Sequence, residues 1–86
     1  MEQTIVVTGS TRGIGFGLAA AFLEAGHNVV ICGRADKSTS AAVDSLAARF
    51  GRDRLLGVGT DVADFEQVEH LWTVTVKRFG RVHIWI

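Results

Sequence analysis

Three glycines stand close together near the amino-terminus, between a short apolar run and a segment with helical periodicity. Residues 4–7 (Thr-Ile-Val-Val) are mostly β-branched and apolar, which is typical of a strand buried on both faces. Residues 8–15 follow with glycine at positions 9, 13 and 15, and from Ile14 onward apolar residues recur at helical spacing until Gly26. The sequence therefore predicts a strand, a tight glycine-rich turn and a helix in immediate succession.

The same alternation of strand and helix repeats along the chain. Residues 29–32 form a second buried-strand run that closes at Gly33 and Arg34, and a helical pattern then ends at Gly51. Residues 55–60 predict the third strand. Its two glycines lower the strand propensity and indicate close approach of another part of the backbone.

A third helix and a fourth strand complete the series. Asp64 with Gln67 three residues later resembles a capping box, and the apolar pattern after it stops at Gly80. Residues 82–86 open a fourth strand, and the chain ends inside it.

The order strand, helix, strand, helix, strand, helix, strand is typical of an α/β fold built by right-handed crossovers. We expect a Rossmann-type, doubly wound parallel sheet, of which residues 1–86 supply the amino-terminal β-α-β-α-β-α-β portion. We therefore expect one domain, an incomplete NAD(P)-binding unit, and a chain that is a fragment of a longer protein.

Composition excludes several other classes of function. Nine basic residues balance nine acidic ones, so no net field favours nucleic acid. No apolar run approaches the ~20 residues that span a bilayer, so no membrane segment is expected, and a single cysteine, Cys32, fits a reducing, cytoplasmic setting. Cys32 is the only cysteine, the histidines lack metal-ligand spacing, and no metal site is expected. His83 and Trp85 alternate with apolar residues, which favours packing roles for both.

Each glycine of the turn has a physical use in binding a dinucleotide. Gly9 allows the sharp turn out of the strand, Gly13 lets the backbone approach phosphate, and Gly15 lets the helix pack against the sheet. The spacing Gly-x-x-x-Gly-x-Gly differs from both the general dinucleotide fingerprint and the P-loop. A glycine-rich turn that serves packing alone is the alternative.

Thr8, Gly9, Gly13, Ile14 and Gly15 match the pattern Thr-Gly-x-x-x-Gly-Ile-Gly without a mismatch. The chain thereby resembles the short-chain dehydrogenase/reductase family over essentially its whole length. The resemblance implies a cofactor-binding set made of Thr8, Gly9, Ser10, Thr11, Arg12, Gly13, Ile14, Gly15, Arg34, Asp61 and Val62.

The end of the second strand indicates which cofactor is bound. Sites for NAD usually place an acidic residue there for the ribose hydroxyls, whereas sites for NADP place arginine there for the 2′-phosphate. This chain has Arg34, and Arg12 stands where NADP-preferring members of the family often carry a second basic residue. Two guanidinium groups on one phosphate predict NADP rather than NAD, with Asp36 as the nearest acidic rival.

Asp61 and Val62 come directly after the third strand. In the family, an Asp-Val pair at this point meets the adenine, and the carboxylate accepts from its exocyclic amine. The alternative is that Asp61 caps a turn or the next helix.

No catalytic residue is expected among these residues. The family's Asn-Asn-Ala-Gly turn, its serine and its Tyr-x-x-x-Lys are absent, and the chain has no tyrosine. The resemblance implies hydride transfer between nicotinamide and a carbonyl or alcohol carbon of a small molecule, by a protein that is a homo-oligomer when full length.

Two other interpretations stay open at this stage. The first is a non-catalytic nucleotide-binding or interaction module whose last strand is completed by a partner chain. The second is the family's extended branch of sugar-nucleotide epimerases and dehydratases, whose turn needs a glycine where Arg12 stands.

Overall fold

The computed structural model describes residues 2–86 and contains the expected alternation of strands and helices. In chain order, the elements are β1 (Thr4–Val7), α1 (Gly13–Glu24), β2 (Asn28–Gly33), α2 (Asp36–Phe50), β3 (Leu55–Gly59), α3 (Phe65–Phe79) and β4 (Ile84–Trp85).

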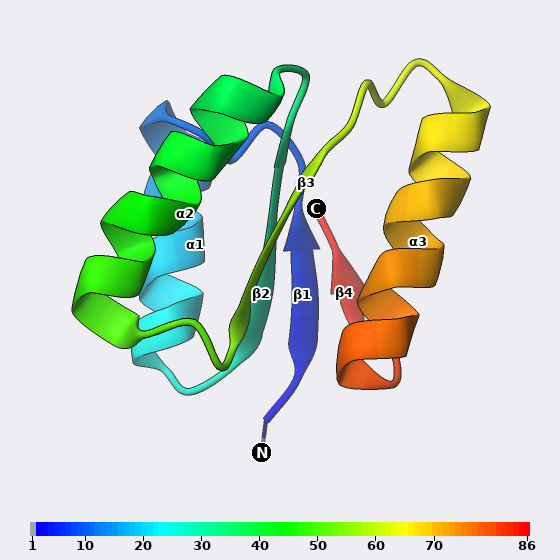
Figure 1. The fold of residues 1–86 in the computed structure, drawn as a ribbon. Coiled ribbons are helices and arrows are strands. Elements are labelled where there is room, and N and C mark those ends of the chain that lie inside the picture. Colours follow the sequence, from blue (N-terminus) through cyan, green and yellow to red (C-terminus); the bar gives the residue numbers. More distant parts are fainter. Residues whose placement is uncertain (1) are drawn as a thin grey trace.

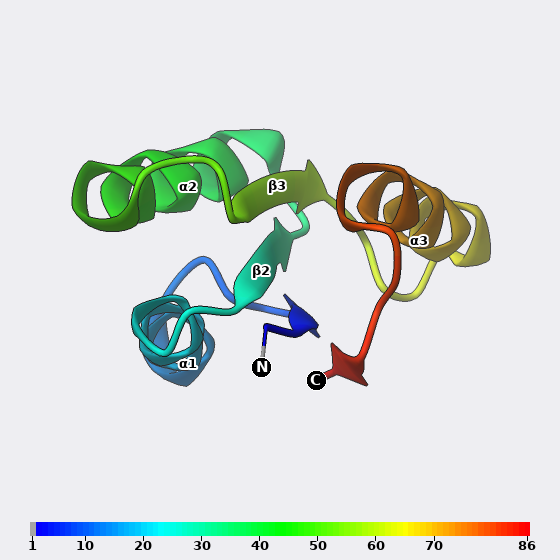
Figure 2. The ribbon, with the colours of Figure 1, turned by 90° about the horizontal axis from the view of Figure 1, so that it is seen from below.

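The four strands form one parallel sheet in the order β3-β2-β1-β4 (Figure 1). The chain steps outward from β1 through β2 to β3, and α3 then carries it back to the other side of β1. Figure 2 shows the result, with α1 and α2 on one face of the sheet and α3 on the other. The predicted doubly wound sheet is confirmed, and the reversal between β1 and β4 is the topological switch point at which such sheets bind ligands.

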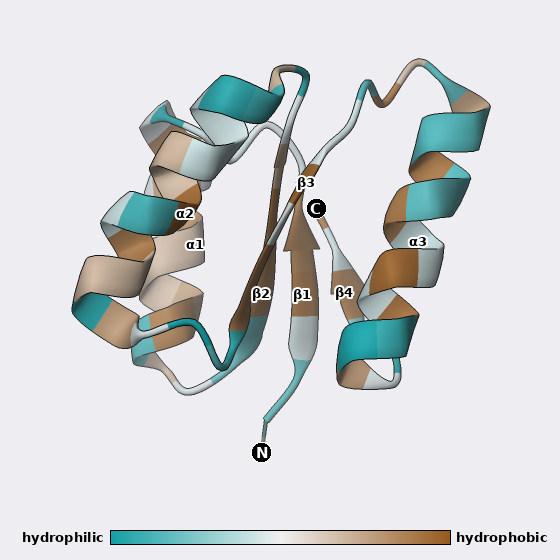
Figure 3. Ribbon diagram, in the orientation of Figure 1, coloured by the Kyte–Doolittle hydropathy of each residue, from teal (hydrophilic) through white to brown (hydrophobic). Residues whose placement is uncertain are grey.

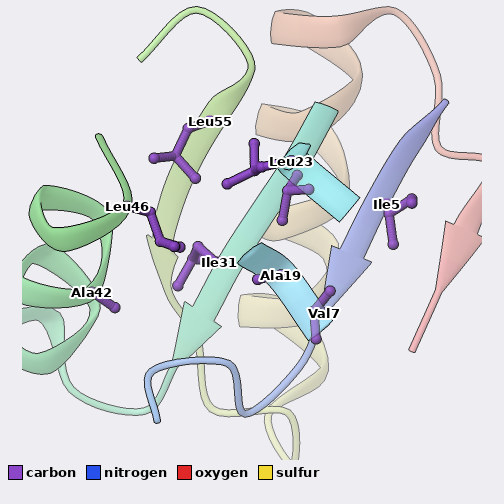
Figure 4. Close-up of a cluster of buried hydrophobic side chains, with 9 residues drawn as sticks. Ile5, Val7, Ala19, Leu23, Ile31, Ala42, Leu46 and Leu55 are labelled. Atoms are coloured by element: carbon purple, nitrogen blue, oxygen red, sulfur yellow. The ribbon is translucent and has the colours of Figure 1, made fainter. Parts of the chain in front are cut away.

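Both faces of the central strands are buried. Ile5 and Val7 point toward α1 and α2, where they join Leu23 and Leu46 in the larger apolar cluster (Figure 4). Val6 points to the opposite face, toward α3. Alternate side chains of a strand go to opposite faces, so a strand covered on both sides needs an unbroken apolar run, visible as the brown strands of Figure 3.

The second cluster, beneath α3, is smaller. It consists of Val6, Val30, Cys32 and Leu71. Burial raises the pKa of the Cys32 thiol to about 11, and Sγ lies 3.4 Å from the carbonyl oxygen of Val7. The thiol is therefore protonated at neutral pH and serves as a small packing group.

Helix α1 buries only part of its apolar pattern. Of the apolar residues that recur at helical spacing from Ile14, Ala19 and Leu23 are buried, whereas the side chains of Ile14 and Leu18 are 86% and 37% exposed. Apolar residues occur on nearly every side of α1. Periodicity alone therefore does not select the face that meets the sheet.

The start of α3 is capped, although not as a complete capping box. Asp64 Oδ1 accepts hydrogen bonds from the backbone N–H groups of Glu66 (3.0 Å) and Gln67 (3.4 Å), as expected. The Gln67 side chain does not return to the backbone of Asp64. Its Oε1 instead accepts from the N–H of Asp61 at 2.8 Å, because the Asp64 N–H already donates to the Asp61 carbonyl.

The fourth strand is shorter than the predicted residues 82–86, because the residues paired with a neighbouring strand are fewer. Only Ile84 and Trp85 pair with β1, but backbone hydrogen bonds extend the contact from His83 to Ile86. His83 Nδ1 also accepts from the N–H of Thr4 at 2.9 Å, and the Trp85 ring stacks on Trp72 at 6.2 Å between centroids. Both side chains thus have structural contacts, and both remain partly exposed.

Two negative expectations concern the described part of the chain. Within residues 2–86 no helix combines the length and apolar character that a membrane crossing requires. Those residues also contain no group of three or more His, Cys, Asp or Glu side chains arranged to hold a metal ion.

Candidate functional site

The loop between β1 and α1 folds sharply over the start of the helix. Gly9 and Gly13 adopt φ angles of +61° and +63°, in the left-handed region that favours glycine. A Cβ atom on Gly15 would lie 2.5 Å from the carbonyl oxygen of Gly9. Gly15 therefore makes room for the turn itself, whereas the sequence indicated that it makes room for the sheet.

The amino-terminus of α1 is left open to an anion. Arg12 occupies the N-cap position with extended backbone, no side chain accepts from the first N–H groups, and the first turn contains no acidic residue. Helix α2 also lacks a side-chain cap, because its N-cap residue is Ala35, although its first turn contains Asp36. Uncapped N–H groups and the positive end of the helix dipole together favour a phosphate.

A cavity of about 460 Å³ lies between the glycine-rich turn and the end of β2, at the carboxyl edge of the sheet. It brings together Arg12 and Arg34, as the sequence predicted for the two basic residues. Its complete lining is Gly9, Thr11, Arg12, Gly33, Arg34, Ala35 and Ser38.

The arginines of this cavity are free to meet a ligand. Among residues 2–86 the one ion pair joins Arg52 to Asp44, far from the turn in the sequence. Asp36, the acidic rival, does not line the cavity. Its carboxylate lies against Gly59 of β3, where it fills the space that a Cβ on that glycine would take.

A separate cavity of about 290 Å³ lies beside β3 and shares no lining residue with the glycine-rich turn. Its two arginines are already engaged. Arg52 Nη2 is 2.7 Å from Asp44 Oδ1, and Arg78 Nη2 donates to the carbonyl of Arg52 at 2.9 Å. The cavity beside the glycine-rich turn is therefore the better candidate for binding an anion.

The turn residues divide into those that face the cavity and those that hold the turn in place. Gly9, Thr11 and Arg12 line the cavity. Thr8 points toward β4, where its Oγ1 donates to the carbonyl of Ile86 at 2.7 Å. Ser10 is fully buried, and its hydroxyl is bonded within the protein.

Gly13 and Ile14 lie at the first turn of α1. Gly13 lines a neighbouring cavity of about 470 Å³ between α1 and α2, which shares Thr11, Arg12 and Ser38 with the first. The Ile14 side chain projects into solvent. Their contacts with a cofactor remain predictions.

Asp61 and Val62 come after β3 at the same edge of the sheet, but they do not line the cavity of the two arginines. Asp61 Oδ1 accepts from the N–H of Ala63 at 3.0 Å, so the carboxylate takes part in a local turn. The Val62 side chain is exposed and available to a flat ring. An adenine contact for this pair stays a prediction.

Sequence reasoning missed Ser38, Ala35 and Gly33 as cavity residues. Ser38 is exposed and its Oγ donates to the carbonyl of Ala35 at 3.2 Å. Its position four residues after Arg34, in the first turn of a predicted helix, was a usable signal. A Cβ on Gly33 would lie 2.5 Å from Thr11 Cγ2, so this glycine lets the turn lie against β2.

A parallel sheet with this strand order, and with a glycine-rich turn leading into an uncapped helix, defines a Rossmann-type nucleotide-binding protein. The sequence model of the short chain dehydrogenase family matches residues 3–86, and the chain belongs to this family of oxidoreductases, which bind NAD or NADP.

Similar proteins support the assignment. The chain is 43% identical over 82 residues to chlorophyll(ide) b reductase NOL, chloroplastic, from Arabidopsis thaliana, an alignment covering 95% of this chain and 23% of that protein. L-sorbose reductase from Gluconobacter frateurii, complexed with NADPH and L-sorbose, superposes with a TM-score of 0.88 at 33% identity, over 98% of this chain and 32% of that one.

The N-domain of a bacterial malonyl-CoA reductase, solved with NADP, gives a TM-score of 0.89 at 33% identity, over 96% of this chain and 16% of that one. The chain thus spans about a quarter of the length of the curated relative and a third or less of these two structures.

Proposed function

We propose that this chain is the NADP(H)-binding part of an oxidoreductase that transfers hydride between nicotinamide and a carbonyl or alcohol carbon of a small molecule. The observation that carries the proposal is that Arg12 and Arg34 line one cavity beside two uncapped helix starts. The same cavity lacks a carboxylate among its lining residues.

This arrangement favours NADPH over NADH on electrostatic grounds. A 2′-phosphate carries nearly two negative charges, and each guanidinium can offer two parallel N–H donors to it. Ribose hydroxyls would instead favour an acceptor carboxylate, and Asp36 lies against Gly59. NADP(H) in the L-sorbose reductase and malonyl-CoA reductase structures supports the choice.

The residues of this chain would bind and orient the cofactor. Gly13 and the first N–H groups of α1 would hold the pyrophosphate, and Asp61 with Val62 would border the adenine. Bound NADPH would supply the hydride. Because the chain contains no tyrosine, we propose that the family's proton-transferring group lies outside these 86 residues.

The test is the affinity of the purified complete protein for NADPH and NADH. Arg34→Ala should raise the Kd for NADPH roughly 10–100-fold, because one charge-assisted contact to phosphate is lost, and should change the Kd for NADH about twofold or less. Arg81→Ala, at an exposed arginine after α3, is the matched control. Equal losses for both cofactors would contradict the phosphate assignment.

A second candidate is a non-catalytic nucleotide-binding module completed by a partner chain. The exposure of Ile84, Trp85 and Ile86 at the open edge of the sheet favours some cover for β4. Oxidation of NADPH by the complete protein with a panel of aldehydes and ketones separates the two candidates. Stoichiometric NADPH binding without any turnover, in a protein that purifies with a partner, would favour the module.

Two further parts of the proposal concern the protein in the cell. We propose a homo-oligomer in the cytoplasm, testable by light scattering and by cell fractionation. The chloroplastic relative makes fractionation informative, because organellar recovery would contradict the cytoplasmic location.

A further inference from the structure

Ser10 joins the glycine-rich turn to β2 through both its backbone and its side chain. Its N–H donates to the carbonyl of Cys32 at 3.1 Å, and its Oγ accepts from the N–H of Cys32 at 3.0 Å. The Ser10 side chain is completely buried. The hydroxyl therefore acts as the acceptor that a neighbouring strand would supply.

The contact between Ser10 and Cys32 lies just before one of the two arginines in each segment, the glycine-rich turn and the end of β2. Arg12 comes two residues after Ser10, and Arg34 comes two residues after Cys32. The pair is thus the last direct hydrogen-bonded link between the turn and β2 before the two arginines enter the cavity. Gly33 and Thr11, one residue further on, pack closely against each other.

We propose that Ser10 is a positioning residue for cofactor selection, because its paired hydrogen bonds to Cys32 set the spacing at which Arg12 and Arg34 reach one phosphate. This inference rests on the proposed NADP(H) function. It assigns Ser10 no contact with the cofactor, in contrast to the cofactor-binding role that its place in the motif implied.

The physical argument compares the needs of the two cofactors. The pyrophosphate is held by the turn and α1 alone, so it tolerates a small shift of the turn relative to β2. The 2′-phosphate needs groups from both the turn and β2, and paired guanidinium contacts depend strongly on geometry. Loss of the link should therefore weaken NADPH more than NADH.

Thr75→Val is the control for removal of a buried hydroxyl. Thr75 is also fully buried, on α3, and among residues 2–86 its Oγ1 finds no hydrogen-bond partner. Valine has nearly the same shape. The variant therefore removes a buried hydroxyl from α3, on the face of the sheet where the Cys32 side chain also packs, without touching the turn. It tests whether loss of a hydroxyl on that face is enough to change the labelling of Cys32.

The experiment measures the Kd values for NADPH and NADH, and the rate at which N-ethylmaleimide labels Cys32, in the complete protein and three variants. Labelling is followed by mass spectrometry of the peptide that contains Cys32. Ser10→Ala is the main variant. Ser10→Gly is the second variant and is used if Ser10→Ala fails to fold. Glycine has no methyl group, so water can reach the Cys32 N–H that has lost its acceptor.

We expect Ser10→Ala or Ser10→Gly to raise the Kd for NADPH about tenfold and that for NADH about threefold or less. We also expect labelling of Cys32 without cofactor to accelerate about tenfold, because the buried strand end opens more often. Thr75→Val should leave both Kd values and the labelling rate unchanged.

Two results would overturn the inference while leaving the proposed function intact. One is a parent protein that prefers NADPH together with Ser10 variants that keep the same ratio of Kd values, which would make Ser10 a residue of the fold alone. The other is an unchanged rate of Cys32 labelling. A parent protein without preference for NADPH would overturn the proposed function, and this inference with it.

Discussion

The helix starts at the carboxyl edge of the sheet differ in how their first N–H groups are satisfied. At α3, the Asp64 carboxylate accepts from two of them. At α1 and α2, the N-cap residues are Arg12 and Ala35, and neither supplies an acceptor. The two uncapped starts are the ones that border the cavity between Arg12 and Arg34.

The difference shows that α1 and α2 begin without the stabilisation that a side-chain cap gives α3. A good N-cap contributes about 1 kcal/mol, and a cation at a helix start opposes the dipole by a few tenths of a kcal/mol or more. Arg12 at the start of α1 therefore has a local disadvantage, which a bound phosphate would reverse. Capping at α3 serves the fold, and the uncapped starts leave room for an anion.

The largest expected effect comes from blocking the open start of α1. Gly13→Val puts a β-branched residue at φ +63° and directs a side chain into the open space before the helix. The affinities for NADPH and NADH should both fall ~100-fold or more, as measured by fluorescence titration. Gly17→Val is the control, because Gly17 is an exposed glycine within α1 with open space around it. Affinities that survive the Gly13 change would refute the glycine-turn site.

The next effect comes from giving α2 the cap that it lacks. Ala35 has extended backbone suited to a capping side chain, so Ala35→Asp should stabilise the protein by about 1 kcal/mol. The same carboxylate beside Arg34 should weaken NADPH about tenfold. Ala35→Asn caps similarly without the charge and should bind NADPH more tightly than the aspartate variant. Thermal unfolding measures the stability and titration measures the affinity for NADPH. An aspartate variant that is both more stable and tighter in NADPH binding than the parent would contradict the prediction.

The smallest effect comes from removing the cap of α3. Asp64→Ala should lower the free energy of unfolding by about 1 kcal/mol, because two backbone N–H groups lose their acceptor. The Kd for NADPH should change about twofold or less, since Asp64 does not line the cavity. Urea unfolding and NADPH titration measure the two quantities, with Asp64→Asn as the control that keeps a cap. A large loss of NADPH affinity would mean that α3 belongs to the site.

Features that depend on neighbours in sequence were predictable. The unbroken apolar run of residues 4–7 indicated a strand covered on both faces, and Gly26, Gly51 and Gly80 indicated helix ends, where all three have positive φ. These are local preferences of backbone and side chain, so they are visible without a fold.

Features that depend on distant neighbours were missed or only half predicted. The apolar pattern of α1 did not distinguish the exposed Ile14 from the buried Leu23, because the sheet selects the buried face. The Gln67 side chain went to Asp61 because the preceding loop brought that N–H within reach. Ser10 looked like a ligand contact within its motif. Its partner, Cys32, is 22 residues away.

The sequence by itself determined the alternation of elements, the glycines at the left-handed positions of the turn, and the presence of one arginine in each of the loops that follow the first and second strands. Only the tertiary structure decided that Arg12 and Arg34 share a cavity, that Asp36 lies against Gly59 outside it, and that Ser10 ties the turn to β2. The physical reason is range: dihedral preferences and apolar periodicity act within a few residues, whereas the direction of a side chain in a shared cavity is settled by packing between segments that only the sheet brings together.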